Sequence, residues 1–241
     1  MKQRRLPEID LANIAPRSSD EKRKALLPFS LGGGGWSYDP SRKRVLDVTD
    51  CGAPLDIEPR KSTLTQIERD IRRTCTHGEE QVKANIEVTR LLHKWSKENL
   101  ERAVSFHIPA LGFGHLGSVD YCYNFLGRYR GDDCIFAFDH RRGKGYSVHG
   151  RQFAFSMMHE QARVAFPELA SAKLVIVQFP ALPNLGRQIR LFDDTGIELF
   201  SFEQLSQMIN DTYAIWGDIL REKAESQREE ERRTGTSGTL I

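Results

Sequence analysis

Two short apolar segments constrain the fold of this chain most strongly. Residues 134–138 are Cys-Ile-Phe-Ala-Phe, and residues 173–179 are Lys-Leu-Val-Ile-Val-Gln-Phe. A run of consecutive apolar residues such as 134–138 or 174–177 is typical of a strand that is buried on both faces, whereas a strand with one wet face alternates apolar and polar residues. A sheet with such strands at its centre needs helices to cover it, so the two segments predict an α/β fold.

The remaining pattern supplies the helices and the other strands. Apolar residues recur at helical spacing at 79–101, 150–166 and 202–222, and the capping-box spacing of Thr63 and Gln66 predicts an earlier helix. Further strands are expected at 104–109, 118–125, 188–193 and 197–200, the last two forming a hairpin. We therefore predict a mixed β-sheet flanked by helices, in a two-layer or three-layer sandwich.

The segments on either side of this core, which we place at residues 62–222, have a different composition. Residues 1–61 are polar, contain prolines and lack a clear period, so we expect an irregular arm that is loosely ordered, or ordered only against the core or a partner. Residues 44–48 are expected to form one short strand within it. Residues 223–241 are expected to form a charged tail, beginning as a solvated helical extension or as disorder.

Charge and cysteine content exclude several classes of protein. The net charge is +2, so any nucleic-acid-binding surface would have to be local. The four cysteines form no C-x-x-C pair, which argues against a zinc knuckle and fits reduced thiols in the cytoplasm. No apolar run approaches the ~20 residues needed to span a bilayer, so we expect no membrane association.

The densest group of charged residues that could form a site follows the 134–138 strand. Asp139 ends the strand, and His140, Arg141, Arg142 and Lys144 come after it. Loops at the ends of buried strands are held rigidly, and many functional sites are built there. The simpler interpretation is a strand-end turn in which Asp139 caps the backbone or pairs with a neighbouring cation.

The order helix, strand, strand, strand with an acid–x–cation end, helix, strand resembles the core of the PD-(D/E)XK nuclease superfamily, which has the restriction-endonuclease-like fold. The resemblance covers roughly residues 79–180 and implies a divalent metal such as Mg²⁺. It places Asp120 and Asp139 as the metal-binding acids, with Glu98 or Glu101 as the helical acid.

The cation of the family's pattern is altered in this chain. Arg141 stands where the family has a lysine, and Lys144 lies nearby but outside the pattern. Because an arginine does not lose its proton, it cannot act as a base. The resemblance therefore implies either an active metal-dependent nuclease or a catalytically degenerate member that binds nucleic acid.

Nucleic-acid binding would depend on a local group of cations. The N-terminus of the predicted 150–166 helix favours anions, and five cations flank this helix or lie in its entry loop. The predicted phosphate-binding residues are Arg141, Arg142, Lys144, Arg151 and Arg163. DNA or RNA is the partner that this interpretation predicts.

The alternative is a non-enzymatic protein-interaction or adaptor domain. Residues 1–61 and 222–241 are segments that either bind a partner or stay solvated, so another protein is the predicted partner here. Catalytic motifs of other classes are weak. His159-Glu160 begins a zincin motif, but Arg163 replaces the second histidine. Cys122 and His107 could form a nucleophilic Cys–His pair, but buried cysteines that only pack in the core are far commoner than nucleophilic ones.

Overall fold

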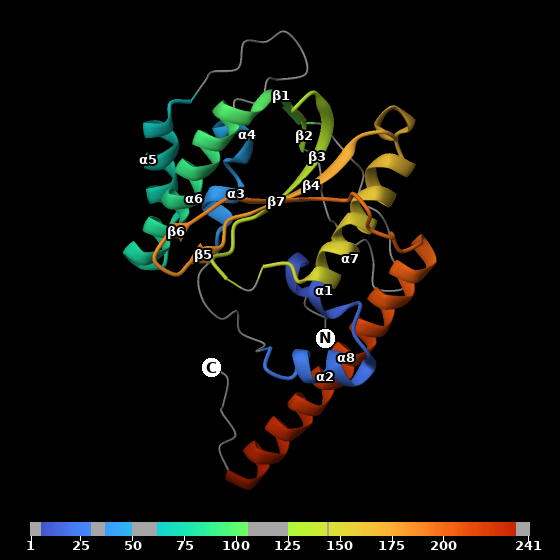
Figure 1. Cartoon of the computed structure of the whole chain (residues 1–241). Helices are drawn as coiled ribbons and strands as arrows, with labels where there is room; N and C mark the ends of the chain where they lie inside the picture. The colour runs from blue at the N-terminus through green and yellow to red at the C-terminus, as the bar shows by residue number, and fades with distance from the viewer. Residues whose placement is uncertain (1–5, 30–36, 50–61, 106–124, 144, 235–241) are drawn as a thin grey trace.

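The computed structural model describes residues 6–29, 37–49, 62–105, 125–143 and 145–234, and their elements form three layers (Figure 1). The middle layer is a five-stranded sheet with the order β1-β2-β3-β4-β7. Its strands are β1 (Leu100–Ser105), β2 (Phe125–Tyr129), β3 (Asp132–Asp139), β4 (Lys173–Gln178) and β7 (Arg190–Asp193). β3 and β4 are parallel and the other pairs antiparallel, so the predicted mixed sheet is confirmed.

Helices cover both faces of the sheet, which explains why the central strands are continuously apolar. Along β3, Ile135 and Ala137 enter one hydrophobic core, and Cys134 and Phe136 enter the other. The first core contains side chains of α1 (Glu8–Ile14), α2 (Ser19–Leu26), α7 (Val148–Met158) and α8 (Phe202–Thr234). The second contains side chains of α4 (Val45–Val48), α5 (Leu64–Thr74) and α6 (Gly78–Asn99). Each apolar residue of β3 thus packs against one of two helical layers.

The chain passes from β3 to the parallel strand β4 through α7. Ser147 caps this helix by accepting a hydrogen bond from the backbone N of Gly150 at 3.0 Å. A π-helical turn at His159–Val164 and a 3₁₀ turn at Pro167–Leu169 follow, so the predicted 150–166 helix ends irregularly. The connection places the end of β3, the start of α7 and the end of β4 close together.

Residues 6–29 belong to the α7–α8 layer rather than to a separate arm. Leu11 and Leu26 are fully buried in its core, and the backbone N of Leu6 donates to the Tyr213 hydroxyl at 3.2 Å. A capping box of Ser18 and Glu21 begins α2, because each side chain satisfies an otherwise unpaired amide at the helix start. The sequence left open whether residues 1–61 are loosely ordered or are ordered only against the core or a partner. For residues 6–29, the structure shows order against the core.

The structure differs from the prediction in two local elements. Residues 44–48 were expected as a strand, but Val45–Val48 is the helix α4, with Val48 buried against α6. The predicted hairpin of 188–193 with 197–200 does not form, since β7 pairs with β4 instead. The backbone of Phe200 donates to Ser156 Oγ at 2.9 Å, and residues 197–200 pack beside α7 without strand pairing. The expected strands at 104–109 and 118–125 fall largely outside the described residues.

The remaining elements are small or peripheral. The helix α3 (Asp39–Arg42) lies against α6, and β5 (Ala181–Leu182) and β6 (Gly186–Arg187) form a separate two-stranded hairpin. α8 continues to Thr234 as one helix, and its last turns project beyond the body of the molecule (Figure 1). Among the helices that the structure describes, none combines the length and apolar character that crossing a bilayer requires.

Candidate functional site

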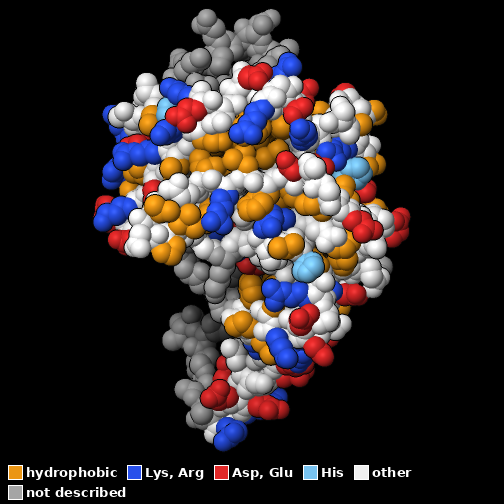
Figure 2. Space-filling model, viewed as in Figure 1, with side chains coloured by type: hydrophobic (Ala, Val, Ile, Leu, Met, Phe, Trp, Pro, Cys, Tyr) orange, Lys and Arg blue, Asp and Glu red, His pale blue; other side chains and the backbone are white. Residues whose placement is uncertain are grey.

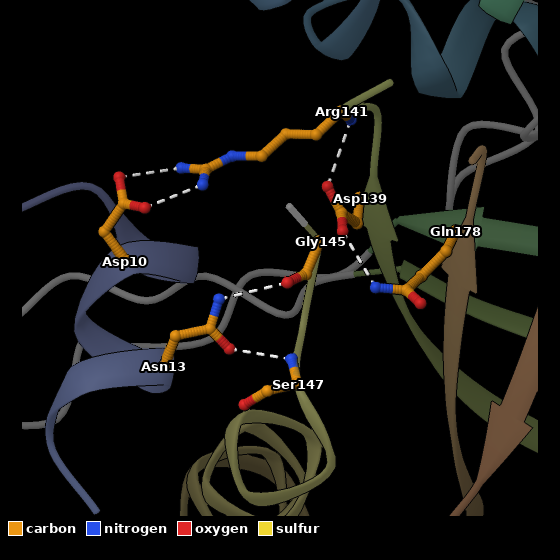
Figure 3. A network of polar contacts seen from close by, with 7 residues as sticks. All are labelled: Asp10, Asn13, Asp139, Arg141, Gly145, Ser147 and Gln178. Atoms are coloured by element: carbon orange, nitrogen blue, oxygen red, sulfur yellow. Dashed lines mark hydrogen bonds and ion pairs between the residues drawn. The ribbon is translucent and has the colours of Figure 1, made fainter. Parts of the chain in front are cut away.

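The predicted site at the end of β3 is a closed network of polar contacts (Figure 3). Asp139 is 1% exposed. Its Oδ1 accepts a hydrogen bond from the Arg141 backbone N at 3.1 Å, and its Oδ2 accepts one from Gln178 Nε2 at 2.9 Å. Gln178 ends β4 and is in register with Asp139, so the parallel pairing of the two strands brings the side chains together. Both carboxylate oxygens are therefore satisfied within the protein.

Two opposing effects act on the pKa of Asp139. Burial raises the pKa, because the charged form loses its hydration. The hydrogen bonds from the Arg141 backbone and from Gln178 lower the pKa, because they stabilise the carboxylate, and burial is the larger effect. Such a group is consistent with a buried structural acid.

Arg141 pairs with a residue of α1. Its guanidinium makes two hydrogen bonds to Asp10, at 2.8 and 3.0 Å to the two carboxylate oxygens, with both side chains about a quarter exposed. This bidentate geometry uses the planar fork of the arginine fully. The cation that would have faced a phosphate is thus neutralised by the N-terminal segment (Figure 3).

A second residue of α1 fixes the loop between β3 and α7. Asn13 donates to the carbonyl of Gly145 at 3.0 Å and accepts from the backbone N of Ser147 at 2.8 Å. Gly145 lies so close to the network that a Cβ there would sit within 3.0 Å of Asp139 Oδ2 and 2.6 Å from Gln178 Nε2. The backbone itself therefore covers the carboxylate.

Two more of the predicted phosphate-binding cations also have partners inside the protein. Arg163 pairs with Asp194 at 2.7 Å and donates to the Ala172 carbonyl at 2.7 Å. Arg151 lies over the Phe192 ring, with Cζ 4.0 Å from the ring centroid. Arg142 is exposed, and Lys144 lies outside the described part of the chain. The predicted patch therefore does not present five free cations.

The acids predicted to bind a metal are not brought together by the described residues. Glu98 is exposed near the end of α6, 4.0 Å from Lys94. In the sheet, Leu100 at the start of β1 pairs with Tyr129 of β2. Tyr129 in turn pairs with Asp132 at the start of β3. The seven-residue rise from there to Asp139 is roughly 23 Å at ~3.3 Å per residue, so Glu98 is at the opposite end of the sheet.

The other half of the predicted metal pair is not described. Asp120, like Cys122 and His107, lies in the undescribed range 106–124. Within the described ranges, no group of three or more histidine, cysteine, aspartate or glutamate side chains is arranged to hold a metal ion. The proximity of Asp120 to Asp139, and with it Mg²⁺ binding, stays a prediction.

A second buried polar cluster surrounds His140, which sequence reasoning missed. The imidazole is 2% exposed, with Nδ1 2.8 Å from Ser41 Oγ and the ring packed edge-to-face against Phe179. Burial, reinforced by the nearby Arg42 and Arg187, lowers the pKa of His140 to about 3. The imidazole is therefore neutral at physiological pH. No local sequence pattern predicts this cluster, because its residues come from segments that are far apart in the sequence.

Contacts of Arg187 and Ser41 complete this cluster. Arg187, whose side chain is fully buried, donates to the His140 carbonyl at 3.2 Å and to the Tyr38 hydroxyl. The backbone of Ser41 donates to Asn85 Oδ1 on α6 at 3.0 Å. Together these bonds attach α3 and the β5–β6 hairpin to the end of β3.

The outer edge of β7 has a different character. β7 is the last strand of the described sheet and pairs only with β4 there. Ile189, Leu191 and Phe192 are half-buried along this segment, Arg190 is exposed, and Leu185 at the tip of the β5–β6 hairpin is 67% exposed. Figure 2 shows hydrophobic and basic side chains side by side at the level where β7 crosses the molecule in Figure 1.

Comparison with known proteins identifies the family. Residues 9–226 match the family model described as "Sliding clamp-binding bacterial toxin SocB". The chain belongs to the SocB family. It is 36% identical over 241 residues to the DNA replication inhibitor toxin SocB of Caulobacter vibrioides (strain NA1000 / CB15N), with 99% of this chain and 98% of the relative covered. No solved structure matches.

Membership of the SocB family corrects the resemblance inferred from the sequence. The assignment to the PD-(D/E)XK superfamily was wrong, and so was the preference for a nuclease-like or nucleic-acid-binding function. The order of elements on which it depended is compatible with many α/β sandwiches. The acid–x–cation pair of Asp139 and Arg141 is instead used internally, with Gln178 and Asp10. The family supports the alternative, a protein-interaction function.

Proposed function

We propose that this chain is a non-enzymatic inhibitor of DNA replication that acts by binding a bacterial sliding clamp. The observation that carries the proposal is the match to a replication-inhibiting toxin across almost the full length of both chains. A match of this extent includes both helical layers and every strand of the sheet. It therefore relates the whole fold, and with it the whole surface, to that of a clamp-binding family.

The charge distribution supports a protein partner over a nucleic acid. The net charge is +2, and Arg141, Arg163 and Arg151 are each engaged by groups of the same chain. Binding to nucleic acid draws most of its affinity from cations that contact phosphates. With these three arginines engaged, the cation patch predicted after β3 offers fewer such contacts, whereas apolar residues at a strand edge suit a protein surface.

A direct binding measurement tests the proposal. Purified protein is titrated into an immobilised bacterial sliding clamp, with an unrelated protein of similar size and charge as the control surface. We expect saturable binding to the clamp alone. In parallel, primer extension by a replicative polymerase is measured with and without the clamp. We expect inhibition only of the clamp-dependent synthesis, and inhibition of equal size without the clamp would contradict the mechanism.

The same preparation tests the rejected alternative. Incubation with DNA and RNA in the presence of Mg²⁺ or Mn²⁺ should leave both substrates intact if the protein acts through the clamp alone. Cleavage that disappears in Asp139→Ala would instead restore a nuclease function. A protein with the proposed function acts where the replication machinery is, which in a bacterium agrees with the cytoplasmic location expected from the sequence.

A further inference from the structure

We propose that the outer face of α5 is a docking site for an acidic segment of a protein partner other than the sliding clamp. Arg69, Arg72 and Arg73 form this face, which we call the arginine face. The contact is additional to the clamp binding of the proposed function. Three properties support it: the arginines point away from the core, no described acid pairs with them, and no apolar side chain lies among them.

The packing of α5 turns the three arginines toward solvent. Ile67 and Ile71 are buried in the α5–α6 core. With about 3.6 residues per helical turn, Arg69, Arg72 and Arg73 lie on the opposite side of the helix from these isoleucines. All three arginines are exposed. Figure 2 accordingly shows basic side chains along the left margin of the molecule, where α5 lies in Figure 1.

The first acid of α5 is bonded to a cation of another helix. Glu68 precedes Arg72 by four residues, which is a spacing at which helical ion pairs form. The carboxylate of Glu68 instead accepts two hydrogen bonds from Arg90 of α6, at 2.6 and 2.8 Å. The hydrogen bond from Arg90 is the largest effect that lowers the pKa of Glu68, and the charge of Arg72 has a smaller effect in the same direction. Arg72 is thus left without a close partner on its own helix.

The second acid of α5 is used in the same way. Asp70 precedes Arg73 by three residues, another spacing at which helical side chains meet, but its carboxylate contacts Arg44 at 3.2 Å. In the described part of the chain, no acid forms an ion pair with the arginine face. Like charges four residues apart, as in Arg69 and Arg73, repel each other. A carboxylate from a partner would relieve this repulsion.

Other groups of cations on the described helices are mixed with acids. On α6, Lys83 contacts Glu80 at 3.7 Å and Lys94 contacts Glu98 at 4.0 Å. In the last turns of α8, residues 221–233, arginines and glutamates are interspersed. Mixed charges of this kind are typical of a solvated helix surface. The arginine face differs from them because its charges have one sign.

The chemistry of arginine favours carboxylates as the groups that bind. A planar guanidinium makes two parallel hydrogen bonds to one carboxylate, as Arg90 does with Glu68 on the same pair of helices. Side chains three and four residues apart are neighbours on a helix surface, so the three guanidinium groups lie close together. The arginine face therefore matches a short run of aspartates or glutamates on a partner.

The lack of apolar side chains separates this contact from stable clamp binding. Thr65 and Gln66, which share the outer side of α5 with the arginines, are polar and exposed. Stable interfaces have an apolar core inside a polar rim, whereas exposed ion pairs are weak and are screened by salt. A purely charged face gives a reversible, salt-sensitive contact, which suits a regulatory partner better than a lasting block of the clamp.

The test measures binding of the full chain to a fluorescein-labelled peptide in which glutamate and alanine alternate, by fluorescence anisotropy at about 0.05 M salt. The arginine variant is Arg69→Gln/Arg72→Gln/Arg73→Gln. The matched control removes three exposed lysines of α6 and so changes the net charge equally: Lys83→Gln/Lys94→Gln/Lys97→Gln. We expect the arginine variant to bind roughly tenfold more weakly than wild type and the control to bind within about threefold. Thermal melting shows whether both are folded.

Two further measurements separate the contribution of the fork from that of the charge. Lysine at the three positions of the arginine face keeps the charge and removes the planar fork, so this variant should bind more weakly than wild type and more tightly than the glutamine variant. Raising the salt to about 0.3 M should weaken wild-type binding, because the charges are then screened.

Several outcomes would overturn the arginine face as a protein-docking site. They are absence of saturable wild-type binding, equal losses in the arginine variant and its control, and tighter binding of a single-stranded oligonucleotide of equal charge that the arginine variant loses. Clamp affinity of the arginine variant should stay within about twofold of wild type. A tenfold loss there would assign the face to the clamp and overturn the separate partner, with the proposed function intact.

Discussion

Substitution of Gly145 by alanine should open the polar network at the end of β3. The added Cβ would sit within 3.0 Å of Asp139 Oδ2 and 2.6 Å from Gln178 Nε2, the two atoms of a single hydrogen bond. These are side-chain atoms, but both are buried and bonded, so moving them breaks the bond. Overpacking costs about 1–3 kcal/mol and an unsatisfied buried acceptor a further ~1–3 kcal/mol. We expect Gly145→Ala to lower the free energy of unfolding by about 2–6 kcal/mol.

A glycine two residues earlier provides the matched control. A Cβ at Gly143 would meet nothing within 4 Å, so Gly143→Ala should change stability by less than about 1 kcal/mol. Urea unfolding followed by tryptophan fluorescence at neutral pH gives both values from the transition midpoints. Equal midpoints for the two variants would show that the network yields to the added methyl group, and the account of a tightly closed carboxylate would be refuted.

Three further predictions concern the buried polar groups. Because the pKa of His140 is lowered from 6.5 to about 3, the folded state binds fewer protons than the unfolded state between these values, so wild-type stability should fall by about 2 kcal/mol from pH 6.5 to pH 5. Unfolding titrations of His140→Gln should lack this part of the acid sensitivity. A double-mutant cycle with Arg141→Ala and Asp10→Ala should give a coupling of about 1–3 kcal/mol, above the usual surface ion pair, and a coupling near zero would contradict the bidentate contact. Gly150→Ala should destabilise the fold by about 1–3 kcal/mol in the same assay, because its Cβ would overlap Asn13 Oδ1.

The central layer of the fold could be predicted from the sequence because burial there is nearly complete. Strands β3 and β4 have apolar residues on both faces, and residues 134–138 and 174–177 show that pattern without interruption. The hairpin predicted at 188–200 failed for a non-local reason. Residues 188–193 have the composition of a strand, but their partner is β4, and Phe200 bonds to Ser156 of α7 instead. Local turn signals could not show that competition.

The position of the site could be predicted from the sequence, but its function could not. The charge cluster after residue 138 does lie at a rigid strand end, and the simpler interpretation of a locally paired turn describes Asp139 well. What the sequence could not show is that Asp10, 131 residues earlier, would pair with Arg141. The polar N-terminal segment had no periodic pattern from which its packing could be inferred. Long-range pairing of this kind leaves no spacing signal in a single sequence.

The polar network and β7 are adjacent, so one substitution can test whether the network holds this strand in place. Gln178 donates to Asp139 and is itself in register with Arg190 at the start of β7. Replacement by methionine keeps the volume and removes the Gln178 donor to Asp139 Oδ2, at a cost of about 1–3 kcal/mol. We expect Gln178→Met to speed backbone hydrogen exchange in β7 more than in β2, which is separated from β4 by β3. An equal acceleration in both strands would show that the effect is global, and the network would then stabilise the fold without a specific role in holding β7.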